Sequence, residues 1–478
     1  MIKIKKAEQI SADGAVLVLC TPGNPPEAPG LLSEGREFLE TRDRTSGKVY
    51  VYQQISRHYI FGFFDPSDLT AANIEKVRQC GVNAASVCKG QEYTELSVYS
   101  AGIEPAFSLA ALEGAYLASY SFSRYRKKDD KRKGIEKILV VDDRLTKKQV
   151  EQHTALLEAV CFARDLVNEP PNILTAEEMA KRISSAAKEN GVRAEVFGRK
   201  KIESLKMGGI LAVNRGSVLP PTFTILEWKP DKAANKKPLV LVGKGVVYDT
   251  GGLSLKPTPA SMDMMKCDMA GAAAVAGAII AIAAQKLPVH VIVLIPASDN
   301  RPGGNAYTPG DIITMYNGTT VEIRNTDAEG RLLLADALAY ADRFKPSLLI
   351  EASTLTGAAV RAVGAHVVAA MGTASEDIMA ALAESADNTW ERIIRFPLWD
   401  EYGEEMKSEI ADLNNLGGPY AGQITAGKFL QHFTSYPFIH LDIAGPAFLT
   451  AAKGYLPAGG TGVGVRLIVD FVKKQYSL

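Results

Sequence analysis

Four apolar runs in the second half of the chain limit its fold most strongly. They are Phe223–Leu226, Pro238–Val242, Val289–Ile295 and Leu348–Ile350, and helix-like segments separate them. Each run is apolar almost throughout, apart from Thr224 and His290, instead of alternating with polar residues, which is typical of strands in a sheet covered on both faces. Ligands bind such sheets where the strands end. The pattern therefore predicts an α/β domain with its functional site at the carboxyl ends of strands.

The rest of the sequence indicates two α/β domains. A length of 478 residues suggests two or three domains. Residues 1–144 alternate short apolar runs with helix-like ones and contain no obvious catalytic cluster, so they predict a smaller N-terminal α/β domain. Residues 145–168 predict a linker helix, which Pro170 ends because proline cannot continue a helix. Residues 169–478 predict a larger catalytic domain whose mostly parallel or mixed central sheet has helices on both faces.

Charge and hydropathy argue against nucleic acid and membranes as partners. Lys plus Arg and Asp plus Glu both number 54, so no net field would recruit either partner. The mixed-charge run Arg124–Lys133 is interpreted as a solvated loop, although a nucleic-acid contact there stays an alternative. The longest uncharged run, Met269–Ala284, falls short of a membrane span. It predicts a helix buried inside a large domain.

The cysteine pattern indicates a reducing compartment. The five cysteines are odd in number, widely scattered and without a C-x-x-C pair: Cys20, Cys80, Cys88, Cys161 and Cys267. Reduced thiols fit this pattern better than a disulfide framework or a thiolate zinc site. The apolar run Ala15–Cys20 is too short for the core of a signal peptide. We therefore expect a cytoplasmic protein.

Acidic residues gather where apolar strands give way to helices. Asp327 and Glu329 lie in the octet Asn325–Leu332, just before a helix-like run, while Asp249 follows a strand and Asp268 precedes a small-residue helix. Taken singly, acids at helix starts are caps or partners of the helix dipole. Together, their charges would repel unless a cation lay among them. Two divalent ions bridged by carboxylates are a known solution.

The identity of such a metal stays open at this level. The six histidines show no H-E-x-x-H or other zinc spacing, and His366 and His440 are interpreted as core or supporting groups. Oxygen ligands leave zinc, manganese, magnesium and cobalt all possible. Lys244 could also ligate as a neutral amine, because burial and a nearby cation both lower a lysine pKa. Its glycine-rich stretch, Gly243–Lys256, lacks the spacing of a phosphate-binding loop.

Three stretches resemble the signature sequences of the leucyl aminopeptidase family, which are cytosolic dimetal exopeptidases. They are Gly243–Lys256, Met265–Gly271 and Asn325–Leu332. Further similarity lies in Arg164–Asn168, Thr354–Ala358, Ile410–Asn415 and His440–Gly445. The resemblance extends over essentially all of the chain from about residue 160, whereas the N-terminal third matches loosely. Tyr248, Thr250 and Ala270 depart from the residues common in the family, and none of them removes a ligand.

The resemblance implies two divalent metal ions per subunit, zinc or manganese before magnesium or cobalt. Lys244, Asp249, Asp268 and Glu329 would hold one ion. Asp249, Asp327 and Glu329 would hold the other, with Asp327 also offering its backbone carbonyl. The pair would bind the free α-amine of a peptide, polarise the scissile carbonyl and make hydroxide from a bridging water. Only the first residue of a chain offers such an amine, so an exopeptidase follows.

Further residues acquire roles from the same resemblance. Lys256 would stabilise the oxyanion that forms at the scissile carbonyl. Arg331 would hold a bicarbonate ion that relays the proton from water to the leaving amine, because a guanidinium suits a planar anion. Gly330 and Leu355 would donate backbone N–H groups to that anion.

The resemblance thus implies a homo-hexameric aminopeptidase that removes leucine and other apolar N-terminal residues from peptides. Met265 and Thr354 would line the pocket for the first side chain. Two other interpretations stay open. One is a DNA-binding regulatory protein, motivated by Arg124–Lys133 alone and opposed by the zero net charge. The other is a catalytically inactive scaffold of the same fold. Cys267 is a weak candidate nucleophile because no histidine pairs with it.

Overall fold

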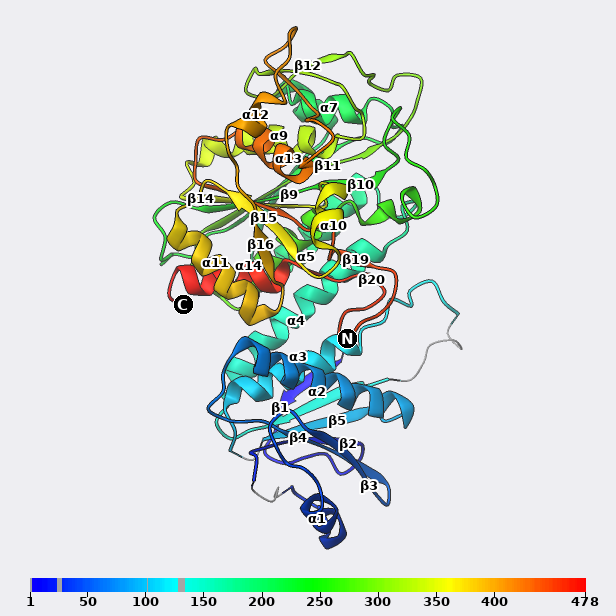
Figure 1. Ribbon diagram of the computed structural model, residues 1–478, viewed down its shortest axis with the longest axis vertical. Coiled ribbons are helices and arrows are strands. Elements are labelled where there is room, and N and C mark those ends of the chain that lie inside the picture. The colour runs from blue at the N-terminus through cyan, green and yellow to red at the C-terminus, as the bar shows by residue number, and fades with distance from the viewer. Residues whose placement is uncertain (1, 24–27, 101, 128–133) are drawn as a thin grey trace. The chain divides into compact units, whose positions relative to one another are not determined.

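The computed structural model describes residues 2–23, 28–100, 102–127 and 134–478 of the chain (Figure 1). It divides into two compact units: Met1–Cys161 with Ala451–Ala458, and Phe162–Thr450 with Gly459–Leu478. The division falls inside helix α4 (Lys147–Asn168). The predicted α/β class, with a smaller N-terminal and a larger C-terminal part, is confirmed. The limits 1–144, 145–168 and 169–478 stay a proposal, and residues 128–133 of the basic run lie outside the described residues.

The first unit is built on a six-stranded sheet. Its strands follow the order β1 (Lys3–Lys6), β6 (Lys137–Val141), β5 (Glu95–Ser100), β2 (Ala15–Cys20), β4 (Arg57–Phe63) and β3 (Val49–Gln54). All neighbours are parallel except the β3–β4 pair. Its helices are α1 (Ser33–Glu40), α2 (Ala71–Gly90) and α3 (Pro105–Ala118). The helices α2 and α3 touch through glycines: a Cβ on Gly114 would lie 1.9 Å from the carbonyl oxygen of Arg78.

The second unit is built on a nine-stranded mixed sheet. Eight strands follow the order β16 (Ile393–Arg395), β15 (Val368–Gly372), β18 (Phe438–Asp442), β14 (Leu348–Ser353), β9 (Leu239–Gly243), β11 (Val291–Asn300), β8 (Thr222–Trp228) and β7 (Arg193–Phe197). The ninth, β10 (Gly245–Asp249), pairs with β11. The four central strands β18, β14, β9 and β11 are parallel, whereas β8 is antiparallel to β11. The predicted apolar runs thus lie in neighbouring strands of one sheet.

Helices cover both faces of this sheet, as the sequence predicted (Figure 1). One face carries α5 (Ala176–Glu189), α8 (Ala270–Ala284), α11 (Glu376–Thr389) and α14 (Val465–Gln475). The other carries α7 (Gly208–Asn214), α9 (Gly330–Ala341) and α13 (Gly422–Gln431). An extensive apolar core lies between the sheet and the second group of helices.

Short elements complete the second unit. They are helices α6 (Arg199–Ser204), α10 (Gly357–Val363), α12 (Glu401–Glu404), η2 (Met262–Cys267) and η3 (Asp342–Phe344), and strands β12 (Ile312–Thr314), β13 (Thr320–Glu322), β17 (Leu413–Asn414), β19 (Phe448–Leu449) and β20 (Gly459–Gly460). The first three of these strands form a small sheet, which ends close to the residues that precede α9.

The buried helix predicted over Met269–Ala284 is confirmed as α8. The segment Met262–Ala284 has the length and apolarity of a membrane-spanning helix, but 89% of its most apolar window is buried inside the structure. Small residues let α8 approach the strands closely. A Cβ on Gly271 would lie 2.0 Å from the carbonyl oxygen of Ala352 on β14 and 3.0 Å from the backbone nitrogen of Lys244. The start of α8 therefore rests on the backbone where β9 and β14 end.

This close approach predicts that Gly271→Ala destabilises the protein. The new methyl group would meet a backbone oxygen that cannot move aside, so the clash outweighs the gain in helix propensity. We expect the free energy of unfolding to fall by about 2 kcal/mol or more. Urea unfolding measures it, with Gly304→Ala as the matched control because its Cβ would meet nothing within 4 Å. Equal midpoints for the two variants would contradict this account of the packing.

Candidate metal centre

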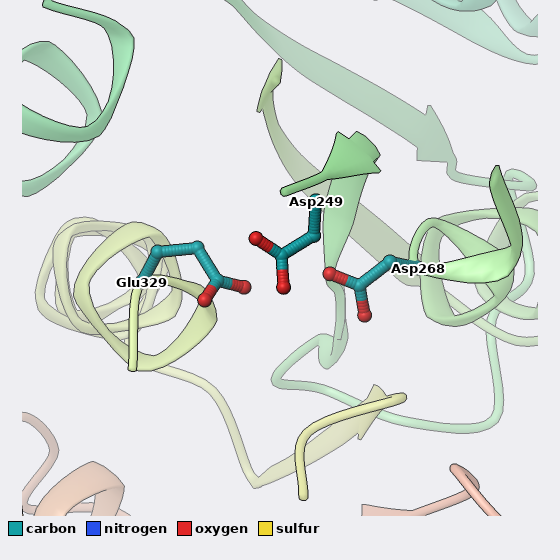
Figure 2. Close-up of side chains that lie close together, drawn as sticks. All are labelled: Asp249, Asp268 and Glu329. Carbon is teal, nitrogen blue, oxygen red and sulfur yellow. The ribbon is translucent and has the colours of Figure 1, made fainter. Parts of the chain in front are cut away.

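Three buried carboxylates converge where strands and helices of the second unit meet. Asp249 is the last residue of β10, Asp268 follows η2, and Glu329 directly precedes α9. Their side chains point toward one another from three different elements (Figure 2). One oxygen atom from each lies within 4.8 Å of the others, and all three residues are buried. Such a cluster is costly unless positive charge compensates it.

Neither Asp268 nor Glu329 caps its helix through its side chain, although Glu329 occupies the N-cap position of α9, so the alternative interpretation of these side chains as helix caps is wrong. The residue at the N-cap of α8 is Met269, and Glu329 makes no capping hydrogen bond at the start of α9. Asp268 instead accepts a hydrogen bond from the Thr354 hydroxyl at 2.8 Å. The carboxylates therefore face the cluster and not the helix ends.

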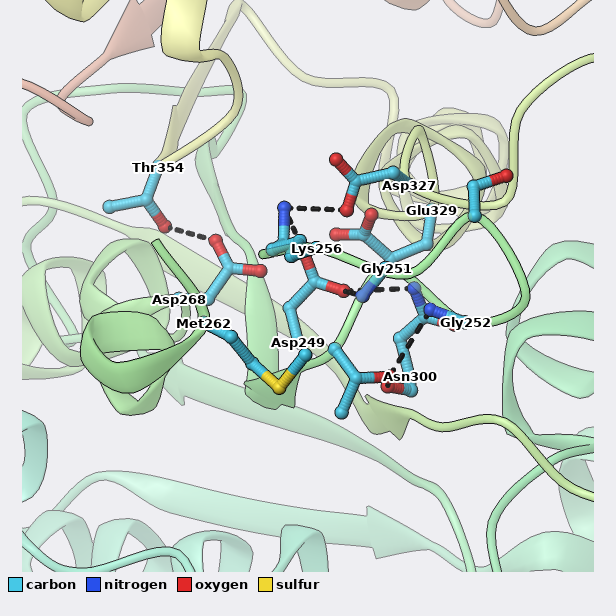
Figure 3. A network of polar contacts seen from close by, with 12 residues as sticks. Asp249, Gly251, Gly252, Lys256, Met262, Asp268, Asn300, Asp327, Glu329 and Thr354 are labelled. Atoms are coloured by element: carbon cyan, nitrogen blue, oxygen red, sulfur yellow. Dashed lines mark hydrogen bonds and ion pairs between the residues drawn. The ribbon is translucent and has the colours of Figure 1, made fainter. Parts of the chain in front are cut away.

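Two lysines form ion pairs with the carboxylates of the cluster. Lys244 Nζ lies 2.7 Å from Asp268 Oδ1 and 2.9 Å from Glu329 Oε1. Lys256 Nζ lies 2.9 Å from Asp249 Oδ2 and 2.5 Å from Asp327 Oδ1 (Figure 3). The octet thus brings Asp327 to the edge of the same site. Two groups of ion pairs therefore contain all five residues that the resemblance suggested as metal ligands: Lys244 with Asp268 and Glu329, and Lys256 with Asp249 and Asp327.

The pKa values follow from burial and from this charge density. Burial lowers the pKa of Lys244, but the carboxylates of Asp268, Glu329 and Asp249 outweigh it and raise the pKa. Burial raises the pKa of Asp268 well above its ordinary value. Burial, followed by the charges of Asp249 and Glu329, raises the pKa of Asp327 to about 7. Full ionisation of all the carboxylates in the site is therefore unfavourable in the absence of further positive charge.

The donor set fits divalent cations. Asp249, Asp268, Asp327 and Glu329 against two lysines leave an excess of two formal negative charges. Asp268 Oδ2 is buried and accepts no hydrogen bond from the described residues. Carboxylate oxygens are the ligands preferred by hard divalent ions, and they also serve zinc. The residues present can hold one cation among Asp249, Asp268 and Glu329.

Hydrogen bonds from more distant segments orient the cluster. The Asn300 side chain donates to Asp249 Oδ1 at 2.9 Å and to the carbonyl oxygen of Thr326 at 2.9 Å. The Tyr307 hydroxyl donates to the same carbonyl at 2.7 Å. Asn300 was not among the predicted site residues. It ends strand β11, so the rule that ligands gather at strand ends could have found it.

Arg331 is a buried cation that forms no ion pair with the described residues. It lies in the first turn of α9, and its Nη1 donates to the carbonyl oxygen of Asn415 at 2.9 Å. Its Nε is buried and donates no hydrogen bond to any residue that the structure describes, and burial lowers the pKa of the guanidinium to about 10. An uncompensated buried guanidinium favours binding of an anion.

The two residues proposed to assist Arg331 differ in what they offer. A Cβ on Gly330 would lie 2.3 Å from Lys244 Cε, so only glycine leaves room for the lysine. The N–H of Leu355 already donates to Asp442 Oδ1 at 3.1 Å. The buried carboxylate of Asp442 also accepts from the Thr356 hydroxyl at 2.7 Å. Asp442 therefore fixes the loop after β14, a role that sequence patterns did not indicate.

The structure also shows the burial and the contacts of the two proposed pocket residues, of Cys267 and of the two histidines. Met265 is half-buried, and both it and Thr354 contact Asp268 through hydrogen bonds. Burial raises the pKa of Cys267 to about 12, which leaves its thiol unreactive. His440 is buried on β18 and contacts Glu351. His366 is exposed before β15, so its assignment to the core or to a supporting role is wrong: it precedes the buried strand instead of lying in it.

Comparison with known proteins finds that this chain is similar to aminopeptidases. Residues 161–469 match the family described as "Cytosol aminopeptidase family, catalytic domain". A probable cytosol aminopeptidase of Geobacter sulfurreducens is 43% identical over 412 residues, 84% of this chain and 82% of that protein. One of Chlorobium phaeobacteroides is 48% identical over 380 residues, 76% of this chain and 74% of that protein. The solved structure "Bottromycin maturation enzyme BotP in complex with Mn" aligns with a TM-score of 0.85 and 30% identity, covering 98% of this chain and 100% of that chain.

Metal ions are expected to stabilise the folded protein. Because the buried carboxylates repel one another, Mn²⁺ or Zn²⁺ added to metal-stripped protein should raise the midpoint of thermal unfolding. A concentration one hundred times the dissociation constant adds about 2.7 kcal/mol. Calorimetry at a fixed scan rate measures the shift, which Asp268→Asn should reduce and the exposed control Asp231→Asn should not. If added metal left the midpoint of thermal unfolding unchanged in the wild type and in every variant, the proposed metal centre would be contradicted.

Proposed function

The chain belongs to the cytosol aminopeptidase family and is a metal-dependent aminopeptidase, and from this premise we propose that it removes leucine and other apolar N-terminal residues from peptides. The observation that carries the proposal is the buried cluster of Asp249, Asp268 and Glu329, whose oxygens lie within 4.8 Å of one another. A site of this kind at strand ends can hold cations against a peptide. Lys256 and Arg331 would supply the two further groups that hydrolysis needs, a cation that stabilises the oxyanion and a binding site for an anion that carries the proton.

Two sets of ligands are proposed, one for each metal ion. Lys244, Asp249, Asp268 and Glu329 would hold one ion, and Asp249, Asp327 and Glu329 the other. Zinc or manganese suits these donors, with magnesium or cobalt as further candidates. When bound, such a pair binds the free amine, polarises the scissile carbonyl and lowers the pKa of water. Because Lys244 and Asp268 are buried, the substrate reaches the site from the side of Lys256 and Asp327, which are partly exposed.

Lys256 is proposed to stabilise the oxyanion that develops on the scissile carbonyl. Its side chain keeps 15% of its surface exposed, whereas that of Lys244 keeps 3%. The charges of Asp249, Glu329 and Asp327 outweigh the effect of burial and raise the pKa of Lys256, so it stays an ammonium. A fixed ammonium in a water-poor site stabilises developing negative charge strongly.

Arg331 is proposed to hold a bicarbonate ion that relays the proton to the leaving amine. Its buried guanidinium, whose Nε has no hydrogen-bond partner among the described residues, supports an anion at this position. Gly330 is proposed to donate its backbone N–H to the ion. Leu355 is proposed to do the same, which requires its N–H to be shared with Asp442. A planar anion matches the forked donors of a guanidinium.

The first side chain of the substrate is proposed to contact Met265 and Thr354. Met265 offers a flexible apolar surface, which suits leucine and methionine alike. Both residues adjoin Asp268, at the side of the cluster where the free amine would bind.

We further propose that the enzyme works as a cytoplasmic homo-hexamer. Light scattering tests the assembly, and a fully active monomer would contradict it.

Lys256→Ala is expected to lower kcat on a leucyl chromogenic amide by about a hundredfold or more, the usual loss on removing an oxyanion donor. Exhaustive chelation should silence the wild-type enzyme, and Mn²⁺ or Zn²⁺ should restore it. Lys232→Ala, at an exposed position, serves as the control for changes in lysine content. Activity that persists in the fully chelated enzyme would overturn the proposed function.

Arg331→Ala is expected to lower kcat and to abolish any response of the rate to added bicarbonate. The wild-type rate should rise with bicarbonate in carbonate-depleted buffer, because the ion supplies the proton relay. Steady-state kinetics over a bicarbonate series measures both effects. A bicarbonate response that survives in the variant would place the ion elsewhere.

A further inference from the structure

A pocket beside the octet has a volume of about 320 Å³ and contains one arginine. Its lining includes Arg324, Glu405, Leu416, Gly417, Pro419 and Tyr420. None of these residues belongs to the metal cluster or to the proposed anion site. The pocket combines a cation with an apolar wall, as a site for part of a peptide would.

The walls of this pocket are attached to the frame of the metal centre. The backbone N–H groups of Arg324 and Asn325 donate to Asn415 Oδ1 at 2.8 and 3.3 Å. The carbonyl of Asn415 accepts the hydrogen bond from Arg331, and Leu416 follows it directly. Arg324 also stands three residues before Asp327, and three residues span at most about 11 Å. The backbone of Arg324, at the wall of the pocket, therefore lies within about 11 Å of the backbone of Asp327.

The pocket is joined to the site by the stretch of chain that leads from Arg324 to Asp327. Asp268 and Thr354, where the first residue is proposed to bind, lie on one side of Lys256 (Figure 3). Asp327, which leads back along the chain to Arg324, lies on the other side. A peptide held by its amine near Asp268 would extend its second residue toward Asp327 and Arg324.

The guanidinium of Arg324 keeps most of its donors for a ligand. Its ion pair with Glu322 Oε2 measures 3.5 Å, and its side chain is 48% exposed. Glu322 Oε2 is already satisfied by the Ser408 hydroxyl at 2.6 Å. Glu405, the acid of the pocket, accepts the N–H of Gly418 at 2.7 Å. Both neighbouring acids thus have donors of their own, and a forked guanidinium suits another carboxylate.

We propose that Arg324 is a specificity-determining residue that binds a carboxylate on the second residue of the substrate. Leu416, Pro419 and Tyr420 contact the rest of that residue. The carboxylate is either the free terminus of a dipeptide or the side chain of an acidic second residue. This inference rests on the proposed aminopeptidase function and adds a substrate class to it.

Two matched pairs of substrates test the proposal and separate the sources of the carboxylate. Leu-Ala and Leu-Ala-amide differ at the terminal carboxylate. Leu-Glu-amide and Leu-Gln-amide differ at the side chain. The wild type should prefer the charged member of at least one pair by about tenfold in kcat/KM, equivalent to about 1.4 kcal/mol. Arg324→Gln should bring that ratio close to one, and Arg324→Lys should keep part of it because the charge remains.

Arg215→Gln is the matched control for the loss of a partly exposed arginine. Arg215 pairs with Asp311 at 3.2 Å and is 54% exposed, which resembles Arg324 and Glu322. This variant should keep the wild-type ratios. Ratios in Arg324→Gln that equal the wild-type ratios for both pairs would overturn the proposal. Failure of the wild type to hydrolyse any of the four substrates would instead overturn the proposed function.

Discussion

The energetic cost of burying negative charge is the constraint on which the catalytic unit depends. Asp249, Asp268 and Glu329 are each at most 3% exposed, and Asp327 adds a fourth carboxylate at their edge. Isolated charges in such surroundings would cost several kcal/mol each. Two lysines, hydrogen bonds from Asn300 and Thr354, and the proposed cations together offset that cost. The fold supplies these groups from strands and helices that meet at one edge of the sheet.

Close approach of the backbone is the second requirement, and glycines meet it. Lys244 reaches Asp268 and Glu329 because Gly330 leaves room for its methylene groups. The start of α8 rests on β14 because Gly271 has no side chain. Both glycines sit directly beside residues that carry charge. A side chain added at either glycine would therefore displace a proposed metal ligand as well as lower the stability of the fold.

Local patterns were sufficient to predict the sheet, the buried helix α8 and the residues of the cluster. Continuous apolar runs identify strands covered on both faces, and Lys244 directly follows one of them, β9, whereas Asp249 ends the short strand β10. The supporting groups were harder to find, because their partners are remote in sequence. Asn415 binds residues about 90 positions away, and Asp442 binds Leu355 at a separation of 87. The periodicity of apolar residues along the sequence cannot predict hydrogen bonds between residues so far apart.

The same distance in sequence explains why Ala451–Ala458 was not assigned to the N-terminal part. In the structure this short segment belongs to the first unit, where the Tyr455 hydroxyl donates to Glu75 at 3.0 Å. The two residues are 380 positions apart. His366 shows the converse limit: a histidine next to an apolar strand looks buried in sequence, although the strand begins only after it.

The two arginines near the octet illustrate how burial separates chemical roles. Arg331 is 6% exposed and forms no ion pair with the described residues, so an anion that binds there relieves a large desolvation cost. Arg324 is about half exposed and already has a long contact with Glu322, so a carboxylate gains far less from it. The buried arginine therefore suits an ion that stays through each cycle of hydrolysis. The exposed one suits a group that must arrive with each substrate and leave with each product, since weak binding permits release.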